Sequence, residues 1–261
     1  MTYTTIEYNK EKNVGYLNFA RPEIHNAFNS TVIYEMSELF DELLDDKELR
    51  VIILSGKGKS FCAGADLNWM RSVKEQSFEK NLDESNKLAD LFYQIYTFPK
   101  PIVGRINGAA IGGGTGFVAV CDISIACESA KFSFSEVKIG VVPACIGPYV
   151  IKKMGEGKAR ELFISGERMY AKRAHEVGLV NSVVADDKLD DEVDKLKNLI
   201  LSSGPEAVAM AKKLVSEVPQ MTPEQFKPYT AEMIANLRVS DEGQEGMDAF
   251  LNKRKPNWVV E

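Results

Sequence analysis

The stretch Ile106 to Asp122, which reads INGAAIGGGTGFVAVCD, decides how the rest of the chain is organised. It follows the Pro-flanked segment Lys100 to Gly104, which is typical of a strand, and it ends in the apolar run Phe117 to Cys121, which is typical of a buried helix. Three consecutive glycines, Gly112 to Gly114, stand between them. Such a junction presents free N–H groups at the positive end of a helix dipole, and these can hold an oxygen that gains negative charge. A tight turn that only packs a helix on a sheet would use the same residues.

A second strand–turn–helix junction is Ser60 to Leu67, which reads SFCAGADL and follows the apolar strand Val51 to Ser55. Two such turns can direct two backbone N–H groups at one oxygen. In this order, SFCAGADL and INGAAIGGG resemble the motifs of the crotonase superfamily, also called the enoyl-CoA hydratase/isomerase family. The resemblance implies that the N–H groups of Ala65 and Gly113 bind the thioester carbonyl of an acyl-CoA. Carried over residue by residue, the acyl-CoA contacts are Ala63, Ala65, Asp66, Leu67 and Gly113.

Composition excludes several classes of function. The chain has 261 residues, of which 44% are hydrophobic and 27% charged, a balance typical of a globular protein of one or two domains. The net charge of −6 argues against a nucleic-acid-binding protein, which needs a basic face. With only His25 and His175 in the chain, we expect no His-based metal site. Coenzyme A would arrive as part of the substrate, so no separate cofactor is expected.

The cysteines, the N-terminal residues and the length of the apolar runs indicate where the protein is located. The four cysteines form no CxxC pair, which favours reduced, structural thiols. The N-terminal residues MTYTTIEYNKEKN lack the apolar core of a signal peptide, and no apolar run is long enough to span a bilayer. We therefore expect a cytoplasmic protein without membrane contact.

The alternation of strand and helix patterns predicts an α/β fold with parallel strands. The crotonase resemblance implies that residues 1–188 form a spiral of ββα units, and that the helical residues 189–261 build a homotrimer or a dimer of trimers. Two local expectations accompany this fold. Ser30 is the expected N-cap of a helix that runs to about Asp46, and the charged segment Lys74 to Asn86 is expected to be mobile and solvated.

Adding water to an α,β-unsaturated thioester needs a polarised carbonyl, a base for the water and an acid for the α-carbon. A carboxylate in a mostly apolar pocket suits this work, because burial raises its pKa toward the working range. The residue that matches the family motif is Glu136, in SEVKIG. The alternative for Glu136 is a solvated glutamate at the end of a strand.

The sequence departs from the usual hydratase pattern at one position. Typical hydratases of the family carry a second glutamate two positions beyond the third glycine, where this chain has Gly116. Relatives that isomerise dienoyl-CoA carry an aspartate where this chain has Ala144, and the aspartate nucleophile of the aryl-CoA dehalogenases is also missing. Within the family this leaves a hydratase that uses Glu136 alone or a Δ3-Δ2 enoyl-CoA isomerase. A non-catalytic acyl-CoA-binding subunit is the alternative outside the enzymes.

Among hydratases, the segments CAGADLNWM, GGGTG, SEVKIG and PACIGPYV together resemble the branch that acts on branched, carboxylated substrates such as 3-methylglutaconyl-CoA or γ-carboxygeranoyl-CoA. The segment Arg21 to Asn29 resembles the RPxxxNAxN segment that lies beside CoA in relatives. There His25 contacts either a CoA phosphate or adenine, or only its own backbone.

Overall fold

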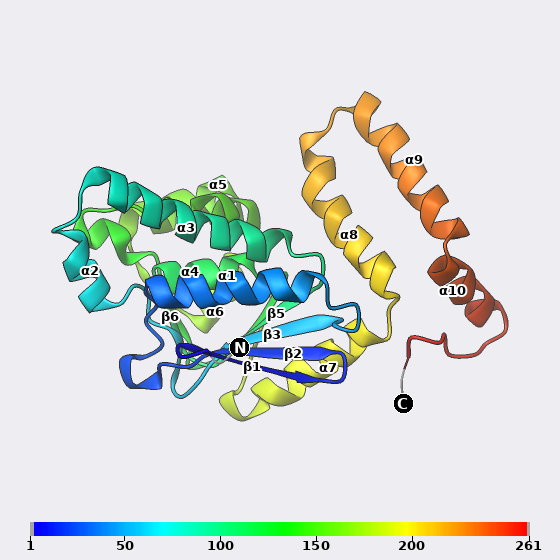
Figure 1. Cartoon of the computed structure of the whole chain (residues 1–261), viewed down its shortest axis with the longest axis horizontal. Helices are drawn as coiled ribbons and strands as arrows, with labels where there is room; N and C mark the ends of the chain where they lie inside the picture. The colour runs from blue at the N-terminus through cyan, green and yellow to red at the C-terminus, as the bar shows by residue number, and fades with distance from the viewer. Residues whose placement is uncertain (1–2, 260–261) are drawn as a thin grey trace. The chain divides into compact units, whose positions relative to one another are not determined.

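The computed structural model describes residues 3–259. The chain divides into two compact units. The first holds the chain up to Phe98 and again from Ile102 to Val193, and the second holds Pro99–Pro101 and the chain from Asp194 onward. Figure 1 draws the elements of both units and labels most of them.

The strands are β1 (Ile6–Glu11), β2 (Val14–Phe19), β3 (Val51–Gly56), β4 (Ser60–Cys62), β5 (Ile102–Ile106), β6 (Ala109–Ile111), β7 (Ile123–Cys127), β8 (Lys131–Ser133), β9 (Arg168–Tyr170) and β10 (Ser182–Val184). The α-helices are α1 (Ser30–Leu44), α2 (Leu67–Val73), α3 (Phe78–Thr97), α4 (Gly113–Val120), α5 (Gly147–Ser165), α6 (Ala171–Glu176), α7 (Leu189–Leu201), α8 (Pro205–Glu217), α9 (Pro223–Val239) and α10 (Asp241–Leu251). Short 3-10 helices are η1 (Pro22–Ile24), η2 (Ser135–Ile139), η3 (Asp186–Lys188) and η4 (Val218–Gln220).

The first unit is a spiral in which β3, β5 and β7 belong to a large sheet and the strand after each of them, β4, β6 and β8, belongs to a small one. The large sheet has the order β1-β2-β3-β5-β7-β10 and the small sheet the order β4-β6-β8-β9. Strands β3, β5 and β7 pair in parallel in the first sheet, and β4, β6 and β8 pair in parallel in the second. The predicted α/β spiral of ββα units is therefore confirmed.

Aromatic side chains anchor α4, the helix that begins at the glycine run. The ring of Phe117 lies 5.0 Å from that of Phe19, 5.7 Å from that of Phe28 and 4.8 Å from that of Phe92, measured between centroids. All four side chains are buried. Because a packed aromatic cluster resists displacement, it fixes the helix whose N-terminus carries the glycines.

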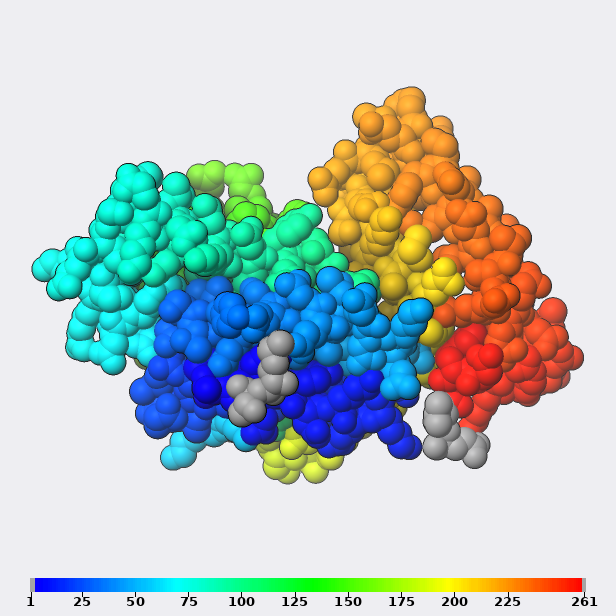
Figure 2. Space-filling model, in the orientation of Figure 1, coloured from blue at the N-terminus to red at the C-terminus, as the bar shows by residue number. Residues whose placement is uncertain are grey.

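Helices α1 and α3 pack together on one face of the first unit, and Figure 2 shows them side by side in blue and cyan-green. On this face one local expectation was wrong and another was incomplete. The N-cap of α1 is Asn29, whose side chain accepts a hydrogen bond from the N–H of Val32, and not Ser30. The charged segment Lys74 to Asn86 is mostly exposed, as expected for a solvated segment, and from Phe78 onward it belongs to α3, which begins after the N-cap Ser77; its mobility stays a prediction. Charged residues suit an exposed helix face as well as they suit a loop, so charge alone did not separate the two.

The second unit is helical, and α8, α9 and α10 all lie within it. Among its described residues, Val215, Val239, Phe250 and Leu251 are apolar and exposed. A role of residues 189–261 in building a trimer remains a prediction. Within residues 3–259, no helix has the length and apolarity needed to cross a membrane.

The buried carboxylate of Glu35 fastens the start of the described chain to α1. It accepts hydrogen bonds from the backbone and hydroxyl of Thr4 and from the backbone and hydroxyl of Thr5, at 2.5–2.8 Å. Burial alone would raise the pKa of Glu35, but these four hydrogen bonds outweigh it and lower the pKa below its usual value.

The lowered pKa gives Glu35 a pH-dependent share of the stability. A carboxyl whose pKa is lower in the folded state stabilises the fold above its unfolded pKa, about 4.3, and this contribution is lost as the pH falls through the folded pKa. Glu35→Gln should lower the free energy of unfolding by about 1–3 kcal/mol near neutral pH, because one amide cannot replace both acceptor oxygens. In urea titrations the deficit should shrink below the usual pKa of glutamate. The exposed Glu42→Gln variant is the control, and a deficit that did not change with pH would contradict the assignment.

Candidate active site

The two glycine turns lie in direct contact. Strands β4 and β6, which lead into them, run parallel with Cys62 opposite Ala110. A Cβ atom on Gly114 would lie 2.0 Å from the carbonyl oxygen of Cys62, and one on Gly64 would lie 2.8 Å from that of Ile111. Only glycine permits such close backbone contacts, so these residues bring the two turns together.

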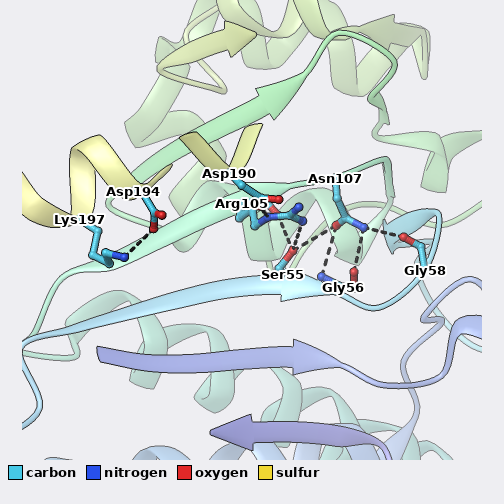
Figure 3. A network of polar contacts seen from close by, with 8 residues as sticks. All are labelled: Ser55, Gly56, Gly58, Arg105, Asn107, Asp190, Asp194 and Lys197. Atoms are coloured by element: carbon cyan, nitrogen blue, oxygen red, sulfur yellow. Dashed lines mark hydrogen bonds and ion pairs between the residues drawn. The ribbon is translucent and has the colours of Figure 1, made fainter. Parts of the chain in front are cut away.

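A polar network behind the turns holds the loops that precede them (Figure 3). The side-chain amide of Asn107 donates to the carbonyl oxygens of Gly56, at 2.8 Å, and Gly58, at 3.0 Å. Two residues earlier, in β5, Arg105 forms an ion pair of 2.6 Å with Asp190. The loop before β4 and the loop before β6 are therefore fixed to each other independently of the turns themselves.

The first turn presents the N–H of Ala65. Phe28 and Ala65 form an isolated parallel bridge, in which the N–H of Phe28 donates to Gly64 and the N–H of Asp66 donates to Phe28, both at 2.8 Å. In a parallel bridge of this kind the N–H of the central residue, Ala65, faces away from the paired segment. Within residues 3–259 it has no hydrogen-bond acceptor.

The second turn presents the N–H of Gly113, the first residue of α4. The N–H groups of Thr115 and Gly116 both donate to the carbonyl of Gly112, which closes the first turn of the helix. No acceptor for the N–H of Gly113 lies in the described part of the chain. This is a free donor at a helix N-terminus, where negative charge is stabilised.

Glu136 lies beside the second turn. It belongs to η2, which follows strand β8, and its carboxylate oxygen Oε1 would lie 3.2 Å from a Cβ atom on Gly112. Its other oxygen, Oε2, is buried and has no hydrogen-bond partner among residues 3–259. Burial raises the pKa of Glu136 above its usual value. Gly112, beside which the carboxylate lies, directly precedes the donor residue Gly113. A part-buried carboxyl group with a raised pKa in this place is suited to proton transfer.

The place of a second carboxylate is filled by apolar atoms. A Cβ atom on Gly116 would lie 2.1 Å from Cγ2 of Ile146 and 3.1 Å from the ring of Phe92. Gly116, Ile146 and Phe92 are all buried. No side chain larger than hydrogen fits at position 116 unless Ile146 moves.

Phe28, which the sequence reasoning did not assign to the site, lies beside the second turn, and Trp69 packs against it. The ring of Phe28 lies against Gly113, where a Cβ atom would be 2.7 Å from Cε1. Trp69 stacks at a tilt on Phe28, with centroids 5.8 Å apart, and its indole N–H donates to Glu84 at 2.9 Å. The signal for Phe28 was its place in the Arg21–Asn29 segment, but only the fold shows that this segment meets both turns.

The remaining predicted acyl-CoA contacts, Ala63, Asp66 and Leu67, differ in their exposure and in their hydrogen bonds. Leu67 is 67% exposed, as the first residue of α2, and Ala63 donates its N–H to the carbonyl of His25 at 3.0 Å. Asp66 is buried and binds other protein groups, described below. His25 is exposed and contacts the hydroxyl of Ser60 through Nδ1 at 3.0 Å, so its side chain has a partner other than its own backbone.

Two free backbone donors beside a part-buried carboxylate, on a spiral of ββα units, define a protein of the crotonase fold. The fold is shared with solved structures. One is the crystal structure of an enoyl-CoA hydratase from Shewanella pealeana, with a TM-score of 0.94 and 37% identity over 98% of this chain and 96% of that chain.

Sequence comparison gives the family. The family model described as "Enoyl-CoA hydratase/isomerase" matches residues 9–260 of the chain. The chain is similar to the crotonyl-CoA hydratase of Syntrophomonas wolfei, 32% identical over 99% of both chains. It is also similar to the short-chain-enoyl-CoA hydratase of Clostridium acetobutylicum, 31% identical over 98% of this chain and 97% of the other. The chain therefore belongs to the enoyl-CoA hydratase/isomerase family, and its enzyme class is that of the enoyl-CoA hydratases.

Proposed function

We propose that the enzyme adds water to a 2-enoyl-CoA with Glu136 as the sole carboxylate of its site. The N–H groups of Ala65 and Gly113 hold the thioester oxygen. Glu136 accepts a proton from water while the water oxygen bonds to the β-carbon, and electron density moves onto the thioester oxygen. The same carboxyl group then returns a proton to the α-carbon, so one group serves as base and as acid.

The observation that carries this proposal is the contrast between Glu136 and Gly116. The carboxylate of Glu136 has a buried oxygen without a partner among residues 3–259, whereas the position of the second glutamate is occupied by Ile146. A buried carboxylate oxygen without a partner costs free energy, which a reacting water or substrate proton would offset. The names of the relatives from Syntrophomonas and Clostridium support hydration rather than another reaction of the family.

A Δ3-Δ2 enoyl-CoA isomerase is the second candidate. It is favoured by the same observation, that Ile146 leaves no room for a second carboxylate at position 116. In that reaction Glu136 would take a proton from C2 of a 3-enoyl-CoA and return it to C4, with no water consumed. A single carboxylate is sufficient for this transfer. A non-catalytic acyl-CoA-binding subunit would need the donors of Ala65 and Gly113 but not the proton-transfer group.

Turnover in heavy-oxygen water separates these reactions. The purified protein is given crotonyl-CoA, 3-methylglutaconyl-CoA and a 3-enoyl-CoA, and the products are weighed by mass spectrometry. The proposal expects a 3-hydroxyacyl-CoA that carries the label. An unlabelled product of unchanged mass with a moved double bond, obtained alone across all the substrates, would overturn it, and no product from any substrate would favour the binding subunit.

The acyl group is proposed on the motif resemblance. The spread of similarity over CAGADLNWM, GGGTG, SEVKIG and PACIGPYV supports a branched or carboxylated substrate such as 3-methylglutaconyl-CoA, and the short-chain names of the relatives support a small acyl group. The relative rates on crotonyl-CoA and 3-methylglutaconyl-CoA decide between them. A cytoplasmic location and a homotrimer or dimer of trimers remain predictions.

A further inference from the structure

The donor Ala65 belongs to a short paired segment that has no sheet of its own. Besides the bridge between Phe28 and Ala65, the N–H of Ala63 donates to the carbonyl of His25 at 3.0 Å. These few backbone bonds join residues 25–28 to residues 63–66. A bridge this short is weak alone, because cooperative pairing needs longer strands.

Arg21 braces both members of this pair. Its Nη1 donates to the carbonyl oxygen of Ala27 at 2.6 Å, and its Nη2 donates to Oδ2 of Asp66 at 2.8 Å. The side chains of Arg21 and Asp66 are only 18% and 9% exposed. One planar guanidinium group therefore spans the two segments, at the residue before Phe28 on one side and the residue after Ala65 on the other.

The other oxygen of Asp66 is also occupied. Oδ1 accepts hydrogen bonds from the N–H of Asn68 at 2.7 Å and of Trp69 at 3.4 Å, which caps α2. Burial of the carboxyl group opposes ionisation, but these bonds and the guanidinium of Arg21 lower the pKa of Asp66 below its usual value. Asp66 thus binds the protein rather than presenting a free carboxylate to a ligand.

A second fixed segment supports the position of Arg21 itself. The side-chain oxygen of Asn26 accepts the backbone N–H of Arg21 at 3.0 Å, and its amide donates to the carbonyls of Lys57 and Ser60. Asn26 is 1% exposed and has a left-handed φ of 59°. Asparagine tolerates this conformation better than most residues, and its three bonds tie the loop of Arg21 to the loop before β4.

The paired segments, residues 25–28 and 63–66, also contact the residue of the second donor, because the ring of Phe28 lies against Gly113. A displacement of residues 25–28 relative to 63–66 would change the direction of the Ala65 N–H and its distance from the Gly113 N–H together. We propose that Arg21 is a positioning residue, which aims the Ala65 donor at the thioester oxygen by bracing Ala27 and Asp66. This inference rests on the proposed oxyanion role of Ala65 and Gly113.

The test uses a probe that reports polarisation without turnover. Cinnamoyl-CoA has a carbonyl conjugated to a chromophore, so donors that polarise the carbonyl shift its absorbance to longer wavelength. The measurement is made in the Glu136→Gln background, where the proton-transfer group is absent. The variants are Arg21→Gln and Asp66→Asn. The asparagine retains an oxygen that caps α2 but removes the charged acceptor of Arg21.

With Arg21 intact, the bound probe should show the red shift. Arg21→Gln and Asp66→Asn should each reduce the shift, and in the Glu136 enzyme each should lower kcat about tenfold with a smaller change in KM, because a small misplacement of a donor costs rate rather than binding. Arg173→Gln is the matched control. It breaks another arginine–carboxylate ion pair of the same unit, with Glu161, and should leave the shift unchanged.

The outcomes separate this inference from the proposed function. A full red shift and normal kcat in both folded variants, with folding checked by circular dichroism, would overturn the positioning role of Arg21 alone. No red shift even with Arg21 intact would remove the oxyanion role of Ala65 and Gly113, and this inference with it. Loss of the shift in the Arg173→Gln control would point to general destabilisation and would also count against Arg21.

Discussion

Replacing Glu136 by glutamine should lower turnover at least about a hundredfold, the low end of what a positioned acid–base group contributes. Glutamine keeps the size of the side chain and can still accept a hydrogen bond, but it cannot take a proton from water or return one to carbon. Acyl-CoA binding should survive, because the backbone donors of Ala65 and Gly113 are unchanged. Equilibrium binding of the substrate and single-turnover rates measure the two effects separately.

The pH dependence of kcat/KM tests the role of Glu136 in a second, independent way. Burial raises the pKa of Glu136, so the ionised, basic form is lost at a higher pH than for an exposed glutamate, whose pKa is about 4.3. The wild-type kcat/KM should therefore fall on the acid side with an apparent pKa above that value. Glu136→Gln should show no such limb in its residual activity.

A matched variant, Glu84→Gln, tests whether Glu136 is the only carboxylate that the reaction uses. Glu84 is a part-buried glutamate that accepts hydrogen bonds from Trp69 and Gln76, and Trp69 packs against Phe28 beside the second turn. Glu84→Gln keeps acceptor and donor groups there and should cost far less activity than Glu136→Gln. An equal loss would mean that the site uses a second carboxylate, and full activity of Glu136→Gln would place the chemistry elsewhere.

The alternation of strand and helix patterns predicted the α/β class, and the resemblance of the two glycine turns to the crotonase motifs implied the spiral and the candidate donors. A spiral repeats one junction, strand to glycine turn to helix, and glycine is needed wherever two backbones touch. SFCAGADL and INGAAIGGG carried that signal because Gly64 and Gly114 meet the carbonyls of the opposite turn. Local chemistry of this kind is written in a short stretch of sequence.

The sequence could not show which residues, distant along the chain, contact a given position in the fold. Gly116 shows that a glutamate is missing, but only the fold shows that Ile146 occupies its place. In the same way, Asp66 was predicted to contact the acyl-CoA, and the fold adds its ion pair with Arg21, 45 residues earlier. Both are long-range contacts, which periodicity and spacing do not encode.

Replacing Gly113 by proline should lower turnover by about a hundred- to a thousandfold, the usual cost of removing one oxyanion donor. Gly113 is the first residue of α4, the helix position where proline is best tolerated, since its N–H has no partner within the helix. Proline therefore removes the free N–H while keeping a conformation that begins a helix. Steady-state kinetics give the loss, and circular dichroism verifies the fold.

Proline also adds a Cβ atom, which at this position would lie 2.7 Å from the ring of Phe28. Gly113→Ala adds the same atom and keeps the N–H, so it is the matched control for that displacement. The activity lost by proline beyond the loss in the alanine variant measures the donor itself. The carbonyl of bound cinnamoyl-CoA should lose much of its polarisation in the proline variant and keep more of it in the alanine variant. Equal losses in both variants would assign the effect to Phe28, and a folded proline variant with near-normal turnover would remove the Gly113 N–H from the mechanism.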